Sequence, residues 1–275
     1  MLKPLTRANE AQGGLGDISY TQTRVFKPDL AFLAEHRVIA GMESGPVIDA
    51  YKIMCVQVLQ RLRERQGNSL AVVSPGESEG KTLTAINLAL SLAQEVDQTV
   101  LLVDANLRDP GVHKYFGFTP EVGLSDHLID GVPLGDVLIN PGIERFVILP
   151  GGRPLVNSTE MLGSMKMERL VTELKMRYPS RIVLFDLPPV LSIADAMAFA
   201  PYVDSALMVV QENKTRRAEL LRAAEMLKSV DVLGTVLNMA AEAALEEKDE
   251  RSAMQSLPSW PELRAWWQRT VRRGR

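Results

Sequence analysis

Short runs of apolar residues alternate with amphipathic stretches along the middle of the chain. These runs are rich in Val, Ile and Leu and lie at 70–73, 99–104, 145–150, 181–186, 205–210 and 232–238. Such runs are typical of strands buried on both faces of a parallel sheet. Apolar residues at helical spacing between them, as at 83–92 and 215–229, predict crossover helices. The alternation from 69 to 239 therefore predicts an α/β fold with a doubly wound, mostly parallel sheet.

Two longer helices are predicted beside these elements. Apolar residues recur at helical spacing after Ser44, and Pro46 is well placed in a first turn. This helix either packs on the sheet or forms an oligomer contact, and the pattern does not decide between them. The sequence from Asn157 to Glu160 resembles a capping box, which predicts a second helix that ends near Tyr178.

One predicted strand runs through a turn into a helix that begins Gly80-Lys81-Thr82. The free N–H groups and the dipole at a helix N-terminus attract anions. In a phosphate-binding loop of this layout, Lys81 reaches the β- and γ-phosphates and the Thr82 hydroxyl ligates Mg²⁺. The alternative is an ordinary strand–turn–helix with a solvated lysine.

The start of this loop departs from the full phosphate-loop pattern. The position five residues before Gly80 is Pro75, where the pattern has glycine, and proline donates no N–H. Glu77 and Glu79 also place carboxylates where a phosphate should lie. The rest of the chain must therefore decide between the two interpretations.

Two of the predicted strands end in an aspartate, Asp104 and Asp186. Ligands of open α/β sheets bind beyond the carboxyl ends of the strands, so both carboxylates should lie near the loop. A carboxylate beside a phosphate loop holds the Mg²⁺ shell, which is the Walker-B arrangement expected of Asp186. Together with Gly80-Lys81-Thr82, these acids predict a P-loop nucleotide-binding fold.

The composition limits the number of domains, the kind of partner and the cellular compartment that we expect. The 275 residues suit one α/β domain with tails, and a hydrophobic content of 46% supplies a sizeable core. The net charge of −3 argues against a nucleic-acid partner. The only cysteine, Cys55, excludes an intrachain disulfide and fits a reducing compartment. We find no signal peptide and no apolar run near the roughly 18 residues that span a bilayer, so a cytoplasmic protein is expected.

These motifs together resemble the ATPase domain of bacterial tyrosine kinases, P-loop proteins of the MinD/ParA-like branch that are tied to capsule and exopolysaccharide synthesis. The resemblance covers about residues 44–239, and its residues are at 80–89, 100–110 and 183–189. It implies ATP and Mg²⁺ as cofactors. It also implies a role in exopolysaccharide synthesis or export, a membrane-embedded polysaccharide chain-length determinant protein as partner, and a homo-oligomer.

The resemblance also implies roles for individual residues. The expected catalytic residues are Lys81, Asp104 and Asp186, with Asp104 activating the acceptor hydroxyl or water. The expected nucleotide contacts are Glu79, Gly80, Lys81, Thr82, Leu83 and Asn238, of which Asn238 contacts the adenine. The expected Mg²⁺ ligands are Thr82, Asp104 and Asp186, with Asn106 as an additional candidate.

Several positions depart from the family pattern and keep other functions open. Asn106 replaces the second Walker-A′ acid, and the last tyrosine is Tyr202, so a C-terminal tyrosine cluster is missing. Tyrosine phosphoryl transfer and ATP hydrolysis alone both remain possible outcomes. Gly76 occupies the position of the MinD signature lysine. The alternatives are a MinD/ParA-like membrane-associated switch and a non-catalytic nucleotide-binding scaffold.

The two ends of the chain differ from the middle. We expect an N-terminal extension at 1–43 that is partly disordered, a P-loop domain at 44–240, and an acidic linker with a basic tail at 241–275. Residues 259–275 hold all three tryptophans and five arginines. Such an amphipathic helix suits an anionic membrane surface or a partner groove, or packs back on its own domain. A membrane contact would place the protein at the inner face of the cell membrane.

Overall fold

The computed structural model describes residues 6–7, 24–178 and 180–240. The predicted acidic linker and the predicted membrane-binding tail lie outside these residues. The strands are β1 (Thr6–Arg7), β2 (Arg24–Val25), β3 (Ser69–Val73), β4 (Thr99–Asp104), β5 (Ile139–Asn140), β6 (Phe146–Leu149), β7 (Arg181–Asp186), β8 (Ser205–Gln211) and β9 (Asp231–Asn238). The helices are α1 (Leu30–Glu35), η1 (Ile39–Gly41), α2 (Pro46–Glu64), α3 (Lys81–Ala93), α4 (Val112–Phe116), α5 (Leu124–Asp130), α6 (Leu134–Val137), α7 (Ser158–Leu162), α8 (Met165–Met176), α9 (Asp195–Phe199), η2 (Ala200–Tyr202) and α10 (Arg217–Met226).

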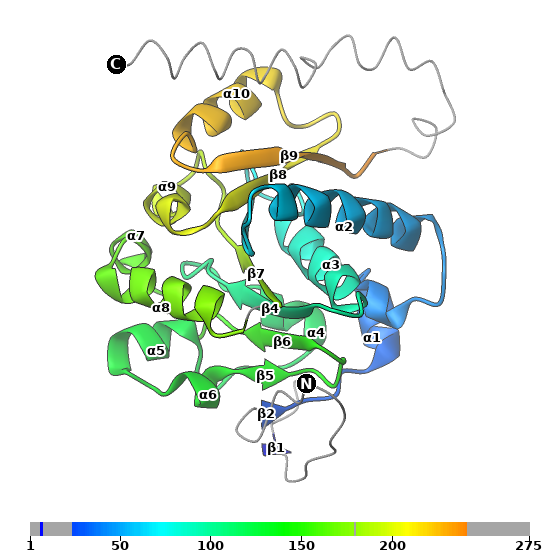
Figure 1. The fold of residues 1–275 in the computed structure, drawn as a ribbon, viewed down its shortest axis with the longest axis vertical. Helices are drawn as coiled ribbons and strands as arrows, with labels where there is room; N and C mark the ends of the chain where they lie inside the picture. The colour runs from blue at the N-terminus through cyan, green and yellow to red at the C-terminus, as the bar shows by residue number, and fades with distance from the viewer. Residues whose placement is uncertain (1–5, 8–23, 179, 241–275) are drawn as a thin grey trace.

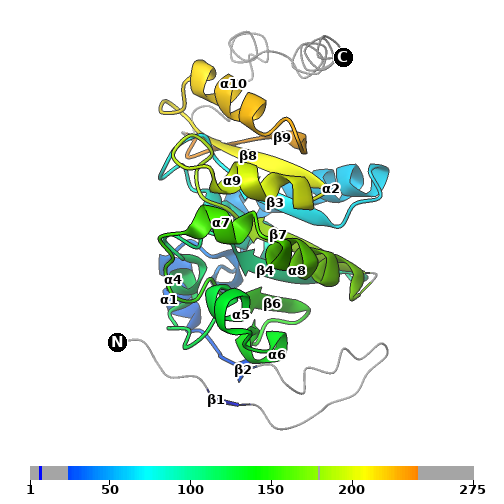
Figure 2. The same cartoon turned by 90° about the vertical axis from the view of Figure 1, so that its left-hand side faces the viewer.

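The strands form one sheet in the order β1-β2-β5-β6-β4-β7-β3-β8-β9. The six strands from β6 to β9 in this order pair in parallel, and the antiparallel pairs of the described residues are β1 with β2 and β5 with β6. Helices cover both faces, with α1, α2 and α3 on one side and α5, α7 and α8 on the other (Figure 1). Figure 2 shows α7, α8 and α9 in front of the strands. The predicted doubly wound, mostly parallel sheet is confirmed.

The apolar strands are buried because each face of the sheet has its own core. Successive side chains of a strand point to opposite faces. Leu70 and Val72 of β3 pack with α2 and α3, whereas Ala71 and Val73 pack with α7, α8 and α9. All five residues of β3 are buried, which explains why the four that follow Ser69 form a continuous apolar run.

Part of the expected N-terminal extension packs into one of these cores. Leu33, Val38 and Ile39 are buried against α2 and α3. The side chain of Asn87, in the middle of α3, accepts a hydrogen bond from the Ile39 N–H at 3.0 Å and donates one to the Arg37 carbonyl at 3.0 Å. A domain boundary at residue 44 stays a prediction, but residues 33–39 share the core of the sheet.

The predicted single helix from 157 to 178 is wrong. The chain forms α7, breaks at Gly163 and Ser164, and continues as α8. Asn157 makes no capping hydrogen bond with its side chain, whereas the Ser164 hydroxyl accepts from the Met167 N–H at the start of α8. The serine therefore caps a new helix, which the apolar spacing alone did not reveal.

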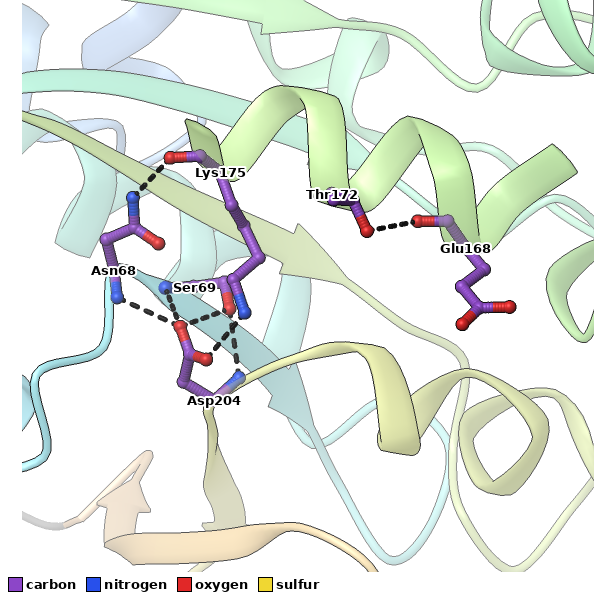
Figure 3. Close-up of polar contacts among 6 residues, drawn as sticks. All are labelled: Asn68, Ser69, Glu168, Thr172, Lys175 and Asp204. Carbon is purple, nitrogen blue, oxygen red and sulfur yellow. Dashed lines mark hydrogen bonds and ion pairs between the residues drawn. The ribbon is translucent and has the colours of Figure 1, made fainter. Parts of the chain in front are cut away.

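A polar cluster joins three elements at the amino end of the central strands (Figure 3). The Asp204 carboxylate accepts hydrogen bonds from the N–H groups of Asn68 and Ser69, from the Ser69 hydroxyl and from the Lys175 ammonium. These bonds lower the pKa of Asp204 although burial opposes them. The cluster fixes β3, β8 and α8 at the edge of the sheet opposite to the one where Asp104 and Asp186 lie.

Candidate nucleotide-binding site

The predicted site residues gather at the carboxyl edge of the sheet. Asp104 ends β4 and Asp186 ends β7, and the two residues are direct partners in the parallel pairing of these strands. β7 also pairs with β3, which leads into the loop at 74–80 and then into α3. Strand order thus brings the two acids and Gly80-Lys81-Thr82 to one place, as the sequence predicted.

The loop before α3 has the shape expected of an anion-binding turn. Gly80 is the N-cap of α3 with φ +85°, in the left-handed region, and Ser78 has φ +56°. A Cβ atom on Gly80 would lie 2.0 Å from Nδ2 of Asn238 and would have to displace that amide, and the positive φ also favours glycine there. Lys81, Thr82 and Leu83 are the first residues of α3, and N–H groups in a first helical turn have no acceptor within the helix. These groups could bind phosphate oxygens.

Asp186 lies at the first turn of α3 and has an unsatisfied oxygen. Its Oδ2 accepts a hydrogen bond of 2.7 Å from the Thr82 hydroxyl, while Oδ1 is buried and has no hydrogen-bond partner in the described part of the chain. Burial raises the pKa of Asp186, whereas the nearby Lys81 charge and the Thr82 hydrogen bond lower it. A buried carboxylate oxygen of this kind is a ready ligand for a cation.

Asp104 is fully buried beside it and organises the loop that follows β4. One carboxylate oxygen accepts from the N–H groups of Gly111 and Val112 at 2.8 and 2.9 Å, and the other from the Asn106 N–H at 3.3 Å. Burial, and next the charge of Asp186, raise the pKa of Asp104 to about 7, although the three N–H groups act in the opposite direction. Asn106, the additional candidate ligand, is bound to Asp104 through its backbone.

This arrangement fits a divalent cation such as Mg²⁺. Two adjacent carboxylates are buried with no lysine or arginine in an ion pair with either of them in the described residues. Oxygen ligands from carboxylates and hydroxyl groups are those that Mg²⁺ prefers. Thr82, Asp104 and Asp186 supply such oxygens, so the predicted ligand set is chemically consistent with the metal.

Glu79 does not have the environment that the sequence suggested. The residue is only 2% exposed, and its carboxylate accepts a hydrogen bond of 2.8 Å from the Gly76 N–H and another from the Thr215 hydroxyl. Its charge therefore supports the loop from within, whereas Glu77 is exposed. The Asn238 side chain, expected to contact adenine, donates at 2.9 Å to the Glu79 carbonyl.

Sequence reasoning missed two residues of this site, Lys214 and Thr215. They lie between β8 and α10, and both contact the loop at 74–80. The sequence here is a short polar turn with no motif. The one signal that could have found them is their position beyond the carboxyl end of a central strand, where ligands of α/β sheets bind.

Comparison with known proteins gives the fold and family. Residues 75–241 match the family model of an AAA domain (AAA_31). The tyrosine-protein kinase YwqD of Bacillus subtilis is 33% identical over 177 residues, which are 64% of this chain and 73% of the relative. The kinase domain of the Escherichia coli tyrosine kinase ETK is 27% identical with a TM-score of 0.65, over 70% of this chain and 74% of that one.

A MinD-type structure is similar at the level of the fold. It is the septum site-determining protein MinD complexed with Mg-ADP from Pyrococcus horikoshii, with a TM-score of 0.54 at 23% identity over 64% of this chain and 72% of that chain. The P-loop ATPase fold predicted from the sequence is confirmed, and this fold implies nucleotide binding.

Proposed function

This chain belongs to the AAA domain family and to the family of bacterial tyrosine-protein kinases, and on that premise we propose that it binds ATP with Mg²⁺ and transfers the γ-phosphoryl group to a tyrosine hydroxyl. The observation that carries the proposal is the junction of Thr82 with Asp186 beside Asp104, at the N-terminus of α3. Phosphoryl transfer depends mainly on positioning and charge neutralisation, and these residues supply both.

The residues in the first turn of α3 and the aspartate that ends β7 have distinct parts in the reaction. The ammonium group of Lys81 binds the β- and γ-phosphates, and the N–H groups of the first turn of α3 hold their oxygens. Thr82 and Asp186 hold Mg²⁺, which neutralises charge on the phosphates when it is bound. Leu83 contributes its N–H to the same turn.

Asp104 accepts the proton of the acceptor in this scheme. The hydroxyl oxygen bonds to the γ-phosphorus, the bond from that phosphorus to the bridging oxygen of ADP breaks, and the hydroxyl proton moves to the Asp104 carboxylate. A carboxylate at this place can take up the hydroxyl proton, and in the metal-free protein burial, and next the charge of Asp186, raise the pKa of Asp104 to about 7.

The cellular setting is part of the proposal. The family resemblance supports a cytoplasmic protein of exopolysaccharide synthesis or export that works with a membrane-embedded chain-length determinant protein. The exposed faces of Ile53 and Val56, which are 62% and 60% accessible on α2, support a contact between copies of the chain. Within the described residues, none of the helices has the length and apolar character needed to cross a membrane.

Binding of ATP by the purified protein tests the proposal. Calorimetry with Mg·ATP should show binding to the wild type, and Lys81→Ala should weaken it by about tenfold or more, because a charged contact to the phosphates is lost. Lys228→Ala, which removes an exposed lysine whose ion-pair partner in the described part of the chain is Glu225, is the matched control. Equal affinity of wild type and Lys81→Ala would refute the assigned nucleotide site.

Mass spectrometry of phosphotyrosine after incubation with ATP separates a kinase from an ATPase. Phosphotyrosine on the chain or on an added tyrosine copolymer, absent in Lys81→Ala, would support phosphoryl transfer. Phosphate release without phosphotyrosine would reduce the function to ATP hydrolysis. Binding without turnover would favour the scaffold.

The MinD-like fold supports a membrane-associated ATPase switch as the second candidate. This function requires that ATP controls attachment of residues 259–275 to anionic lipid. Sedimentation with liposomes, with and without these residues, decides the question. Equal behaviour of the two chains would eliminate the switch.

A further inference from the structure

Three consecutive backbone carbonyl groups of the loop before α3 accept hydrogen bonds from side chains that lie outside the loop. The Lys214 ammonium donates to the carbonyls of Glu77 and Ser78 at 2.7 and 3.3 Å. The Asn238 amide donates to the carbonyl of Glu79 at 2.9 Å. Both side chains come from the neighbouring end of the sheet, after β8 and at the end of β9.

These contacts also fix the direction of the loop N–H groups. In a trans peptide the C=O and N–H of one unit point in opposite directions, and the described residues contain no cis peptide bond. The carbonyls of 77, 78 and 79 share their peptide units with the N–H groups of 78, 79 and 80. Because the carbonyls point toward Lys214 and Asn238, these N–H groups point to the opposite side of the loop.

The N–H groups so oriented are free to receive a ligand. None of the three donates to an acceptor within the described part of the chain. The positive φ values of Ser78 and Gly80 are also typical of the backbone turns whose successive N–H groups surround an anion. The hydrogen bonds from Lys214 and Asn238 to the carbonyl groups thus leave three successive N–H groups that point away from these two side chains.

A second set of hydrogen bonds connects the same loop to the turn after β8. The Gln211 N–H donates to the Thr215 hydroxyl oxygen at 2.9 Å, and the Thr215 hydroxyl donates to the buried Glu79 carboxylate, which also holds the Gly76 N–H. Every donor in this chain of bonds has an acceptor. The turn after β8 is therefore rigidly connected to the phosphate loop, although 136 positions separate Thr215 from Glu79.

We propose that Lys214 and Thr215 are positioning residues that hold the peptide groups of residues 77–80 ready to bind the diphosphate portion of a nucleotide. This inference rests on the proposed function, because it gives a role to residues that support the same site. Their effect is preorganisation: the peptide groups need no rotation when the ligand arrives, so less free energy is lost on binding. A role in the chemical step is not part of it, because neither side chain is placed at the reacting atoms.

Competition binding with pyrophosphate and with ADP, against a fluorescent ADP, tests the proposal. Lys214→Met keeps the length of the side chain and removes its hydrogen-bond donors. It should weaken the binding of pyrophosphate and of ADP by the same factor, about tenfold, because one or two charge-assisted contacts to the loop are lost. Lys228→Met is the control of equal chemistry and should change neither affinity. An unchanged affinity for pyrophosphate in Lys214→Met would overturn the inference.

Thr215 is tested by two variants of nearly equal size. Thr215→Val removes the hydroxyl and should weaken the binding of pyrophosphate and ADP, whereas Thr215→Ser keeps the hydroxyl and should bind both with the wild-type affinity. KM for ATP should rise in Thr215→Val with little change in kcat, since the loss is in binding. A fall in kcat with KM unchanged, or no rescue by serine, would contradict a positioning role.

The outcomes separate this inference from the proposed function. A wild-type protein that binds neither ADP nor pyrophosphate would end the proposed function itself. A wild type that binds both, with Lys214→Met and Thr215→Val equal to it, would leave the proposed function intact and refute the positioning role. Urea denaturation of each variant verifies that it is folded before binding is compared.

Discussion

The two buried carboxylates at the site predict how the stability of the metal-free protein depends on pH. Burial and the neighbouring Asp186 raise the pKa of Asp104 from 3.8 to about 7. A carboxyl group with a raised pKa binds its proton more tightly in the folded than in the unfolded chain. Its contribution to stability is complete below the unfolded pKa and is lost as the pH rises through the folded pKa. The free energy of unfolding should therefore fall between about pH 5 and about pH 8.

The size of the effect follows from the shift. One pKa unit corresponds to about 1.4 kcal/mol, so a shift of 7 − 3.8, about three units, limits the whole contribution to about 4 kcal/mol. The unfolded carboxyl group is already largely ionised near pH 5, and that part of the contribution is lost before the range begins. We expect a fall of about 2.5 kcal/mol between about pH 5 and about pH 8.

Urea denaturation in EDTA across this range measures the fall directly. Asp104→Asn removes this titrating group and should make the profile flatter than that of the wild type, with the remaining slope coming from Asp186, whose pKa is also raised. Asp97→Asn, an exposed aspartate, should keep the wild-type slope. A flat wild-type profile, or the same slope in wild type and Asp104→Asn, would refute the reasoning. Saturating Mg²⁺ should reduce the slope, because a bound cation stabilises the ionised carboxylates.

Three further substitutions test the geometry of the fold and the site. Gly80→Ala should strongly weaken binding of labelled ADP in equilibrium dialysis, because its φ is positive and its Cβ would displace the Asn238 amide that holds the Glu79 carbonyl. Binding equal to that of the wild type would contradict this reasoning. Asp204→Asn should lower the free energy of unfolding at neutral pH by about 2 kcal/mol, because it weakens the charged contacts to Lys175 and Ser69. An unchanged urea midpoint would show that these contacts do not stabilise the fold. Asn87→Leu should destabilise the protein by about 2 kcal/mol in the same assay, because it removes the partner of the buried Ile39 N–H and breaks the partly buried hydrogen bond to the Arg37 carbonyl. Stability equal to wild type would show that water replaces the amide.

The sequence by itself determined the class of fold, and it predicted which residues gather at the carboxyl ends of the central strands. Strands buried on both faces are mainly apolar, so β3, β4 and β7 are visible as runs, and an aspartate that ends such a run lies at the carboxyl edge of the sheet. The sequence Gly80-Lys81-Thr82 marked the start of α3. The roles of Asn238 and Asn106 came only from the family resemblance.

Only the tertiary structure decided how these parts meet. The order β4-β7-β3-β8 made Asp104 and Asp186 neighbours and brought Lys214 and Thr215 to the loop before α3. The structure also buried the Glu79 carboxylate inside the loop, where the sequence showed only an acidic residue at an anion site. The physical reason is that local patterns report burial and helical or strand spacing, whereas contacts between residues more than a hundred positions apart depend on strand order and on which side each peptide group faces.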